Sequence, residues 1–301
     1  MASDPKLPST EQPDRRYDDL DSWAPQAILH AMWEGQLAAV AAVGPALPAI
    51  AAAAEACVEQ LGRGGRLVYA GAGTSGRIGV QDGAELPPTF NWPEDRLVLL
   101  MAGGDVAFTR AVENAEDDVA AGAAAIAAHG VGANDVVIGI AASGSTPFTL
   151  SCLNAARAAG ACTIAVANSA NGAILRAAEF PVLVETGPEV IAGSTRMKAG
   201  TAQKVVLNLL SSLVMVRMGH VYRGRMVDML ARNEKLRRRA ERMVMEITGA
   251  ELEAVRAALV EAGGNVKSAV LVLEGLSGAE ASAALARHGG NLRVTLAGLA
   301  R

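Results

Sequence analysis

The segment from Arg66 to Phe90 constrains the fold of this chain more than any other stretch of the sequence. It opens with a short apolar run, Leu67 to Ala70, passes through a loop of small and hydroxylated residues, Gly71 to Gly76, and then takes up a helix-compatible pattern. This order predicts a strand, a tight turn and the start of a helix. Glycines allow backbone N–H groups to approach a ligand closely, and the N-terminus of a helix favours an anion. The segment therefore predicts a phosphate-binding loop.

The glycines of this loop leave three interpretations open. Gly71, Gly73 and Gly76 fit G-x-G-x-x-G, which by itself is a weak signal for a dinucleotide site. No acidic residue is obvious at the end of a following strand, where it would bind a ribose. The hydroxyls of Thr74 and Ser75 would have no use in such a site. A sugar phosphate suits the loop better, because both hydroxyls can donate to it. The third interpretation is a glycine-rich turn between strand and helix that binds nothing.

The composition is typical of a soluble globular protein. The chain has 301 residues, a net charge of −4 and 51% hydrophobic residues, enough for one large or two modest cores. Only 3% of the residues are aromatic and the basic residues are scattered, so we expect no nucleic-acid partner. The three cysteines, Cys57, Cys152 and Cys162, sit singly in apolar segments without companion histidines. This pattern predicts a cytoplasmic protein with no disulfide and no metal site.

Two charge-free windows, Gly35–Ala54 and Val136–Ala156, approach the length of a membrane span. The first contains Gly44-Pro45 among weakly apolar alanines, and the second is interrupted by Ser143–Pro147. The N-terminal stretch Met1–Gln12 is polar and has no apolar core typical of a signal peptide. We therefore expect no membrane partner.

Strand and helix patterns alternate through the rest of the chain. After the opening strand, buried-strand patterns recur at Leu97–Met101, Asp135–Ala141, Thr163–Ala167 and Phe180–Val184. Helical patterns lie between them, one of them over Phe108–Val119. Such alternation predicts an α/β fold with a doubly wound parallel sheet and with ligands at the carboxyl ends of the strands. The loops Gly71–Gly76 and Ala142–Pro147 both follow predicted strands, so we expect both at that edge of the sheet.

The sequence divides into three expected regions. Residues 1–23 are rich in Pro, Asp and Arg and predict an irregular arm rather than a packed element. Residues 24–248 hold the sugar-phosphate domain, with N-terminal helices, the sheet and a long apolar helix over about Ala202–Met218. This domain ends with a basic amphipathic helix, Ala231–Ile247, whose charges predict a solvated face. Residues 249–301 contain short helical patterns divided by glycine-rich turns and predict a small three-helix domain.

With these blocks in view, the chain resembles the N-acetylmuramic acid 6-phosphate etherases, bacterial enzymes of the sugar-isomerase (SIS) fold, which also covers a glucokinase regulatory relative. The resemblance rests on seven blocks in the same order along nearly the whole chain: Gly71–Arg77, Glu85–Phe90, Ala111–Asp118, Gly139–Gly144, Gly193–Lys204, Asn233–Leu236 and Gly263–Lys267. Several blocks in one order are far more specific than any single loop. The chain departs from the family pattern at Leu86, where cysteine is usual, and at Ser145, where an arginine or similar residue often stands.

The resemblance implies cleavage of the D-lactyl ether of N-acetylmuramic acid 6-phosphate to D-lactate and N-acetylglucosamine 6-phosphate, with no cofactor. Carried across by motif, the two essential glutamates are Glu85 and Glu116. We expect Glu85 to be the acid, because Pro87-Pro88 would rigidify an apolar pocket that raises its pKa. Glu116 is then the base at C2. Glu113, three residues away on the same predicted helix face, is the alternative to Glu116.

The other candidates are residues expected to bind the 6-phosphate or the sugar hydroxyls. They are Gly73, Thr74, Ser75, Arg77, Ser143, Ser145, Thr146, Arg196 and Lys198. Turn and helix-cap chemistry is the alternative for the serines and threonines. Surface placement is the alternative for Arg196 and Lys198, which lie in a third cluster of glycine, hydroxyl and basic residues at Ile191–Thr201.

Two further functions fit the same fold. An aldose–ketose isomerase would need deprotonation at C2 but no acid for a leaving group, and a sugar-phosphate sensor would bind without turnover. Burying two carboxylates beside a phosphate is costly without a use, so Glu85 and Glu116 argue against a sensor. The long apolar helix and the N-terminal arm predict a homodimer whose sites lie near the subunit boundary.

Overall fold

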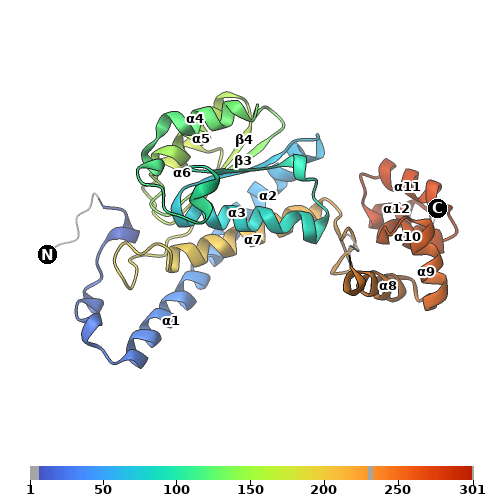
Figure 1. The fold of residues 1–301 in the computed structure, drawn as a ribbon, viewed down its shortest axis with the longest axis horizontal. Helices are drawn as coiled ribbons and strands as arrows, with labels where there is room; N and C mark the ends of the chain where they lie inside the picture. Colours follow the sequence, from blue (N-terminus) through green and yellow to red (C-terminus); the bar gives the residue numbers. More distant parts are fainter. Residues whose placement is uncertain (1–6, 230–232, 300–301) are drawn as a thin grey trace. The chain divides into compact units, whose positions relative to one another are not determined.

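A five-stranded parallel sheet organises the first of two compact units in the computed structural model, which describes residues 7–229 and 233–299 (Figure 1). The strands are β1 (Leu67–Gly71), β2 (Leu97–Met101), β3 (Val136–Ala141), β4 (Cys162–Ala167) and β5 (Phe180–Leu183). Their order in the sheet is β2-β1-β3-β4-β5. β1, β3 and β4 are buried along their whole length, as parallel strands covered on both faces must be. All five strands follow the apolar runs of the sequence to within a residue or two.

Helices cover both faces of this sheet (Figure 1). One face carries α4 (Val119–Ala128), α5 (Pro147–Ala158) and α6 (Ala173–Ala177), and the other carries α2 (Leu47–Gly62), α3 (Gly73–Phe90) and α7 (Lys198–Arg217). On the second face, Tyr69 of β1 donates to the buried Asp82 of α3 at 2.9 Å, and Lys204 of α7 lies 4.0 Å from the same carboxyl group. The predicted α/β fold with a doubly wound parallel sheet is confirmed.

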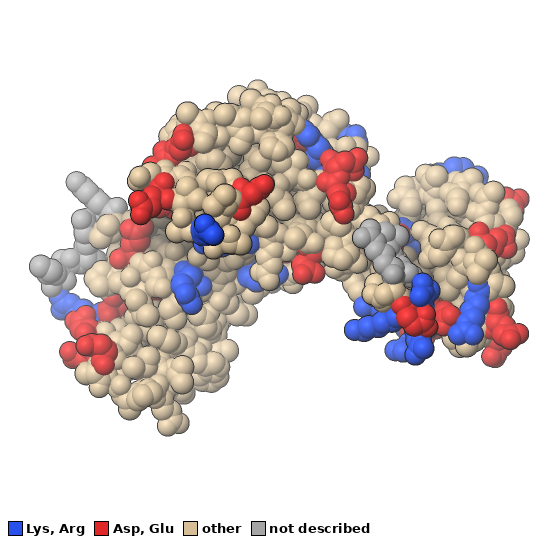
Figure 2. Space-filling model, viewed as in Figure 1, with Lys and Arg blue, Asp and Glu red and all other residues tan. Residues whose placement is uncertain are grey.

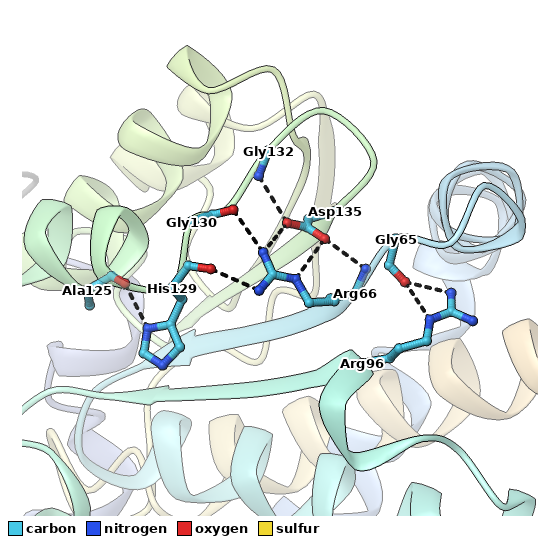
Figure 3. A network of polar contacts seen from close by, with 8 residues as sticks. All are labelled: Gly65, Arg66, Arg96, Ala125, His129, Gly130, Gly132 and Asp135. Carbon is cyan, nitrogen blue, oxygen red and sulfur yellow. Dashed lines mark hydrogen bonds and ion pairs between the residues drawn. The ribbon is translucent and has the colours of Figure 1, made fainter.

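A polar network joins the start of β1 to the turn before β3 (Figure 3). The Arg66 guanidinium donates to both carboxyl oxygens of Asp135, at 3.2 and 2.7 Å, and to the carbonyl oxygens of His129 and Gly130. Asp135 also accepts from the N–H of Gly132. The amino ends of the neighbouring strands β1 and β3 are fixed to each other in this way, at the edge opposite the carboxyl ends of the strands.

The N-terminal arm is packed where the sequence predicts an irregular segment. Its turns are η1 (Ser9–Glu11), η2 (Arg15–Tyr17) and η3 (Leu20–Ser22), and they lead into α1 (Pro25–Ala41) and η4 (Gly44–Ala46). Thr10 is fully buried, and the N–H of Ser9 donates to the hydroxyl of Ser169, 160 positions away. Short turns thus make up this arm, and Ser9 and Thr10 anchor it to the rest of the chain.

The stretch after β2 is also irregular, although the sequence predicts a helix over Phe108–Val119. It forms two short 3-10 turns, η6 (Asp105–Phe108) and η7 (Ala115–Asp117), before α4 begins. Asn114 takes up a left-handed conformation with φ of 58°, and the Asp118 side chain caps α4 by accepting from the N–H of Ala121. Both features stop a continuous helix across this region.

The second compact unit comprises Ala84–Glu94 and the described part of Ser212–Arg301. Besides the end of α3 and the end of α7, it contains the hairpin β6 (Val221–Tyr222) and β7 (Arg225–Met226), and the helices α8 (Glu234–Thr248), α9 (Leu252–Glu261), α10 (Val266–Leu273), α11 (Gly278–Arg287) and α12 (Leu292–Leu299). Within the described residues, four helices follow residue 249, where the sequence predicts three. The expected domain bounds of 1–23, 24–248 and 249–301 stay a prediction. The start of the predicted basic helix, residues 231–232, lies outside the described residues.

A buried ion pair sits within the core of this second unit. Lys267 Nζ lies 2.5 Å from Asp228 and donates to the carbonyl oxygen of Gly290 at 2.7 Å. The basic side chains of α8, by contrast, gather on its surface (Figure 2), where Arg237 and Arg238 pair with Glu234. The predicted solvated face of this helix is confirmed.

Among the described residues, two helical segments are long and apolar enough to cross a membrane by length and composition alone: Pro25–Gly62, which includes α1 and α2, and Lys198–Arg217, which is α7. The bent pair of α10 and α11 would be a third if it counted as one span. More than half of the most apolar window of α7 is buried inside the protein. In the first segment, 33% of the most apolar window is buried.

Candidate functional site

The site lies where the order of the strands reverses. β1 and β3 are neighbours in the sheet, yet their connections lead to opposite faces, so the loops after them separate at the carboxyl edge. A cavity of about 420 Å³ opens there. It is lined by Pro8, Glu11, Ala72, Gly73, Thr74, Ser75, Glu116, Asp117, Ala142, Ser143, Ser145, Thr146, Pro147, Gly193 and Thr195. The sequence predicts both hydroxyl-rich loops at this edge, and the structure brings them together.

The glycine-rich loop after β1 is shaped by close backbone packing. A Cβ on Gly71 would lie 2.8 Å from the Cα of Gly76, so only glycine lets the strand and the first turn of α3 approach this closely. Gly73, the first residue of α3, has a φ of 51°. The first turn of this helix, with Thr74 and Ser75, therefore faces the cavity. Free N–H groups at a helix start, together with two hydroxyls, form a site for an anion.

The second loop, after β3, adds further hydroxyl groups. The N–H of Ser145 donates to the Ser143 hydroxyl oxygen at 3.2 Å, so Ser143 does take part in turn chemistry. Thr146 precedes α5 in the N-cap position, but its side chain makes no capping hydrogen bond. Its hydroxyl is thus left for a ligand, which favours the binding interpretation over the capping one for this residue.

Carboxylates complete the lining. Glu116 and Asp117 come from η7, and Glu11 comes from the N-terminal arm. Glu116 also lines a neighbouring cavity of about 210 Å³, together with Glu113 and Arg77. Because the segment is not a helix, Glu113 and Glu116 do not share a helix face as expected, although both reach the second cavity. Both are exposed, so the expectation that Glu116 is buried is wrong for a single chain.

Arg77 holds the loop that carries these carboxylates. Its Nε donates to the carbonyl oxygens of Ala107 and Phe108, at 3.0 and 3.2 Å, and its Nη2 donates to that of Arg110 at 3.2 Å. In a helix these carbonyl groups would accept from N–H groups further along the chain. Here the Arg77 guanidinium donates to the carbonyl groups in place of those N–H groups, and so stabilises the irregular path of the loop.

The third cluster contributes less to the cavity than the sequence suggests. Gly193 and Thr195 line it, whereas Arg196 is exposed and Lys198 packs its side chain near Gly35 of α1. Burial lowers the pKa of Lys198, although the nearby Glu189 carboxylate acts in the opposite direction. Glu189 itself is fully buried and accepts from the N–H groups of Lys198 and Ala199 at the start of α7.

Glu85 belongs to the second unit, further along α3. Its side chain is exposed, and Pro87 and Pro88 continue the helix beyond it. The expectation that the prolines enclose Glu85 in an apolar pocket is therefore wrong for a single chain. All lining residues of the 420 Å³ cavity, including Glu116, belong to the first unit.

Sequence reasoning missed Pro8, Glu11 and Asp117 in the cavity lining, and the buried cap Glu189. Pro8 and Glu11 lie in a short polar arm with no hydrophobic periodicity, so no local pattern indicates that they line this cavity.

Among the described residues, no group of three or more His, Cys, Asp or Glu side chains is placed to hold a metal ion.

Two overlapping segments of the chain match known domain families. Residues 117–213 match the SIS domain, and residues 49–157 match the glucokinase regulatory protein N-terminal SIS domain. The sheet order and the hydroxyl-lined cavity thus belong to a SIS-domain protein. A phosphoheptose isomerase structure from Francisella tularensis aligns over 64% of this chain and 100% of its own, with a TM-score of 0.48 and 23% identity.

Relatives over the full length define the family more narrowly. An N-acetylmuramic acid 6-phosphate etherase from Deinococcus radiodurans is 52% identical over 295 residues, covering 98% of this chain and 96% of the relative. An etherase of the same name from Halalkalibacterium halodurans is 46% identical over 286 residues, covering 95% and 96%. The chain belongs to the N-acetylmuramic acid 6-phosphate etherase family.

Proposed function

We propose that this protein cleaves the D-lactyl ether of N-acetylmuramic acid 6-phosphate, giving N-acetylglucosamine 6-phosphate and D-lactate, in the recycling of cell-wall amino sugars. It is then a carbon–oxygen lyase that works without a cofactor in the cytoplasm. The observation that carries the proposal is the cavity at the β1/β3 edge, where neutral hydrogen-bond donors and the Glu116 carboxylate face the same space. Relatives named N-acetylmuramic acid 6-phosphate etherase, which match nearly the whole chain, support the choice of substrate.

The phosphate group is assigned to the two hydroxyl-rich loops. The described lining includes no lysine or arginine, so the phosphate charge is met by the start of α3 and by the hydroxyls of Thr74, Ser75, Ser143, Ser145 and Thr146. Neutral donors suit a substrate that must also leave as a phosphorylated product. Arg77, Arg196 and Lys198 act less directly, since none of them lines this cavity.

The chemistry starts from the open-chain aldehyde of the sugar. The C2 proton is then acidic, because its carbanion is conjugated with the carbonyl group, and the lactyl oxygen at C3 lies β to that carbonyl. A base removes the C2 proton, an acid protonates the departing lactyl oxygen, and a C2=C3 double bond remains. Water then adds its hydroxyl to C3 and a proton to C2. Each acid–base step of this kind contributes roughly 10²- to 10⁴-fold in rate.

Glu116 is assigned as the base at C2, because it lies at the cavity near the loops that hold the phosphate. Glu85 is assigned as the acid that protonates the lactyl oxygen. Its exposed position and its place in the second unit suit a residue that completes the site of a neighbouring subunit. A homodimer with sites at the subunit boundary accommodates both assignments.

The outer face of α1 supports a dimer. Leu29, Trp33, Leu37 and Val40 form a stripe along one side of this helix and are 49–66% exposed. The surface of α1 in Figure 2 is largely uncharged. We assign this stripe to contact with a second copy of the chain, since an exposed apolar patch marks an association site.

The test is an incubation with N-acetylmuramic acid 6-phosphate in ¹⁸O-water and, separately, in D₂O, followed by mass spectrometry. Elimination and hydration place ¹⁸O on C3 and deuterium at C2 of the sugar product, with release of unlabelled D-lactate. Glu116→Gln is expected to lower lactate release by roughly 10²- to 10⁴-fold. Glu113→Gln, in the same loop, is the matched control and should retain most activity. Saturable binding without lactate release would overturn the etherase assignment, and ketose formation would indicate an isomerase.

Subunit mixing tests the composite site. Glu85→Gln and Glu116→Gln chains, each inactive alone, are unfolded, mixed in equal amounts and refolded. If each site takes one glutamate from each subunit, half of the dimers regain one of two sites, or about a quarter of wild-type activity. No recovery would place both glutamates in one chain's site.

A further inference from the structure

We propose that Glu11 of the N-terminal arm contacts the sugar and helps to select it, by accepting a hydrogen bond from a neutral O–H or N–H donor of the amino sugar. This inference rests on the proposed function and extends it. Segment 8–11 supplies Pro8 and Glu11 to the lining of the 420 Å³ cavity.

The arm is fixed at the cavity by residues next to Glu11. Thr10 is fully buried, and the N–H of Ser9 donates to the hydroxyl of Ser169, just beyond the carboxyl end of β4, at 3.4 Å. The N–H of Glu11 donates to the carbonyl oxygen of Pro8 at 2.9 Å, which closes the η1 turn. The backbone of Glu11, a lining residue of the cavity, is thus held in place.

The Glu11 carboxylate is unengaged by the protein. Among the described residues, none donates a hydrogen bond to it and none forms an ion pair with it. The nearby Asp14 carboxylate, by contrast, is occupied by the guanidinium of Arg16. A carboxylate that lines a cavity without a protein partner is available to a ligand.

The charge of the cavity limits which part of the ligand it binds. A carboxylate repels a phosphate and accepts only from hydrogen-bond donors, so Glu11 is suited to the sugar ring and not to the 6-phosphate. The hydroxyls and the amide N–H of an N-acetylated sugar are such donors. Hydrogen bonds to a charged acceptor are stronger than those between neutral groups. The loss of this one residue should therefore change the dissociation constant of the sugar measurably.

Binding measurements separate this contact from a general effect of charge. Dissociation constants are measured by calorimetry for N-acetylglucosamine 6-phosphate, glucose 6-phosphate and inorganic phosphate, with wild type, Glu11→Gln and Glu11→Ala. A direct contact predicts sugar-phosphate binding about 10-fold weaker in Glu11→Ala, with inorganic phosphate unchanged or bound more tightly. Loss for the N-acetylated sugar alone identifies the amide N–H as the donor, and loss for both sugars identifies a hydroxyl.

Asp18→Asn is the matched control, because Asp18 is an exposed arm carboxylate outside the cavity lining. It should bind all three ligands as the wild type does. Unchanged or tighter sugar-phosphate binding in both Glu11 variants would overturn the proposal. It would show that Glu11 only repels the phosphate through its negative charge, or that it has no effect on binding. Retained binding of inorganic phosphate shows that each variant has folded. Lactate release by the wild type in the same preparation tests the proposed function separately.

Discussion

Arg77 Nε donates to the carbonyl oxygen of Ala107 at 3.0 Å, and this bond joins the first turns of α3 to the loop that carries Glu113 and Glu116. The two residues are 30 positions apart in the sequence. The guanidinium therefore acts on the site through the loop, because its donors are directed to backbone carbonyl groups and not to the cavity where the phosphate is assigned.

This arrangement predicts a specific kinetic defect. Arg77→Ala should lower kcat by about 100-fold, because a shift of about 1 Å in a catalytic group costs a factor of that order. KM should change much less, since the hydroxyls assigned to the phosphate lie outside the loop that Arg77 holds. Steady-state kinetics of lactate release measures both constants. Arg110→Ala removes the same charge from the loop and is the control. A large rise in KM with kcat unchanged would make Arg77 a phosphate ligand.

The sheet could be predicted from the sequence because each strand is marked by the residues of the strand itself. Buried parallel strands appear as continuous apolar runs, and Val136–Ala141 has no polar residue at all. The loops after β1 and β3 could be placed for the same reason, since a loop that follows a parallel strand must reach the carboxyl edge.

The parts that could not be predicted depend on contacts between distant residues. The helix expected over Phe108–Val119 is replaced by turns because Arg77 binds the loop carbonyls and Asn114 adopts a left-handed backbone. The arm is anchored because Thr10 is fully buried and the N–H of Ser9 donates to Ser169, which no periodicity in a short polar segment reveals. Local propensity is a weak prior that tertiary contacts override.

The Arg66–Asp135 pair predicts how stability depends on pH. Burial alone would raise the pKa of Asp135, but hydrogen bonds from Arg66 and from the N–H of Gly132 outweigh it, and the pKa lies below its ordinary value of 3.8. A carboxyl group with a lowered folded-state pKa stabilises the protein above its ordinary pKa, and this contribution is lost as the pH falls through the lowered one.

Urea unfolding of Asp135→Asn tests this expectation. At neutral pH the variant should lose about 2 kcal/mol of unfolding free energy, the typical value of hydrogen bonds to a charged group. The difference from wild type should shrink as the pH falls below about 4. Asp105→Asn, at an exposed loop position, is the control. A difference that stays constant down to low pH would show that the charge of Asp135 does not contribute.

The three cysteines are expected to be unreactive in the folded protein. Cys57, Cys152 and Cys162 are free and buried, and burial raises the pKa of the Cys152 and Cys162 thiols to about 12. At pH 8 the thiolate that reacts is then only about one part in ten thousand. Titration with a chromogenic disulfide should detect no fast thiol in the native state and all three in guanidinium. A fast-reacting thiol in the native protein would show that one of these segments opens.

The stripe on α1 predicts the oligomeric state. Trp33→Glu places a charge in the middle of the exposed apolar face formed by Leu29, Leu37 and Val40. If a second copy covers this face, the variant must bury a carboxylate or dissociate, and loss of one large buried anchor commonly costs 2 kcal/mol or more, at least about 30-fold in the dimer dissociation constant. Sedimentation velocity at several concentrations measures this change. Val260→Glu introduces the same charge at an exposed position of α9, where it should leave the dimer intact. A Trp33→Glu protein that remains dimeric at the dilution where wild type begins to dissociate would place the interface on another surface.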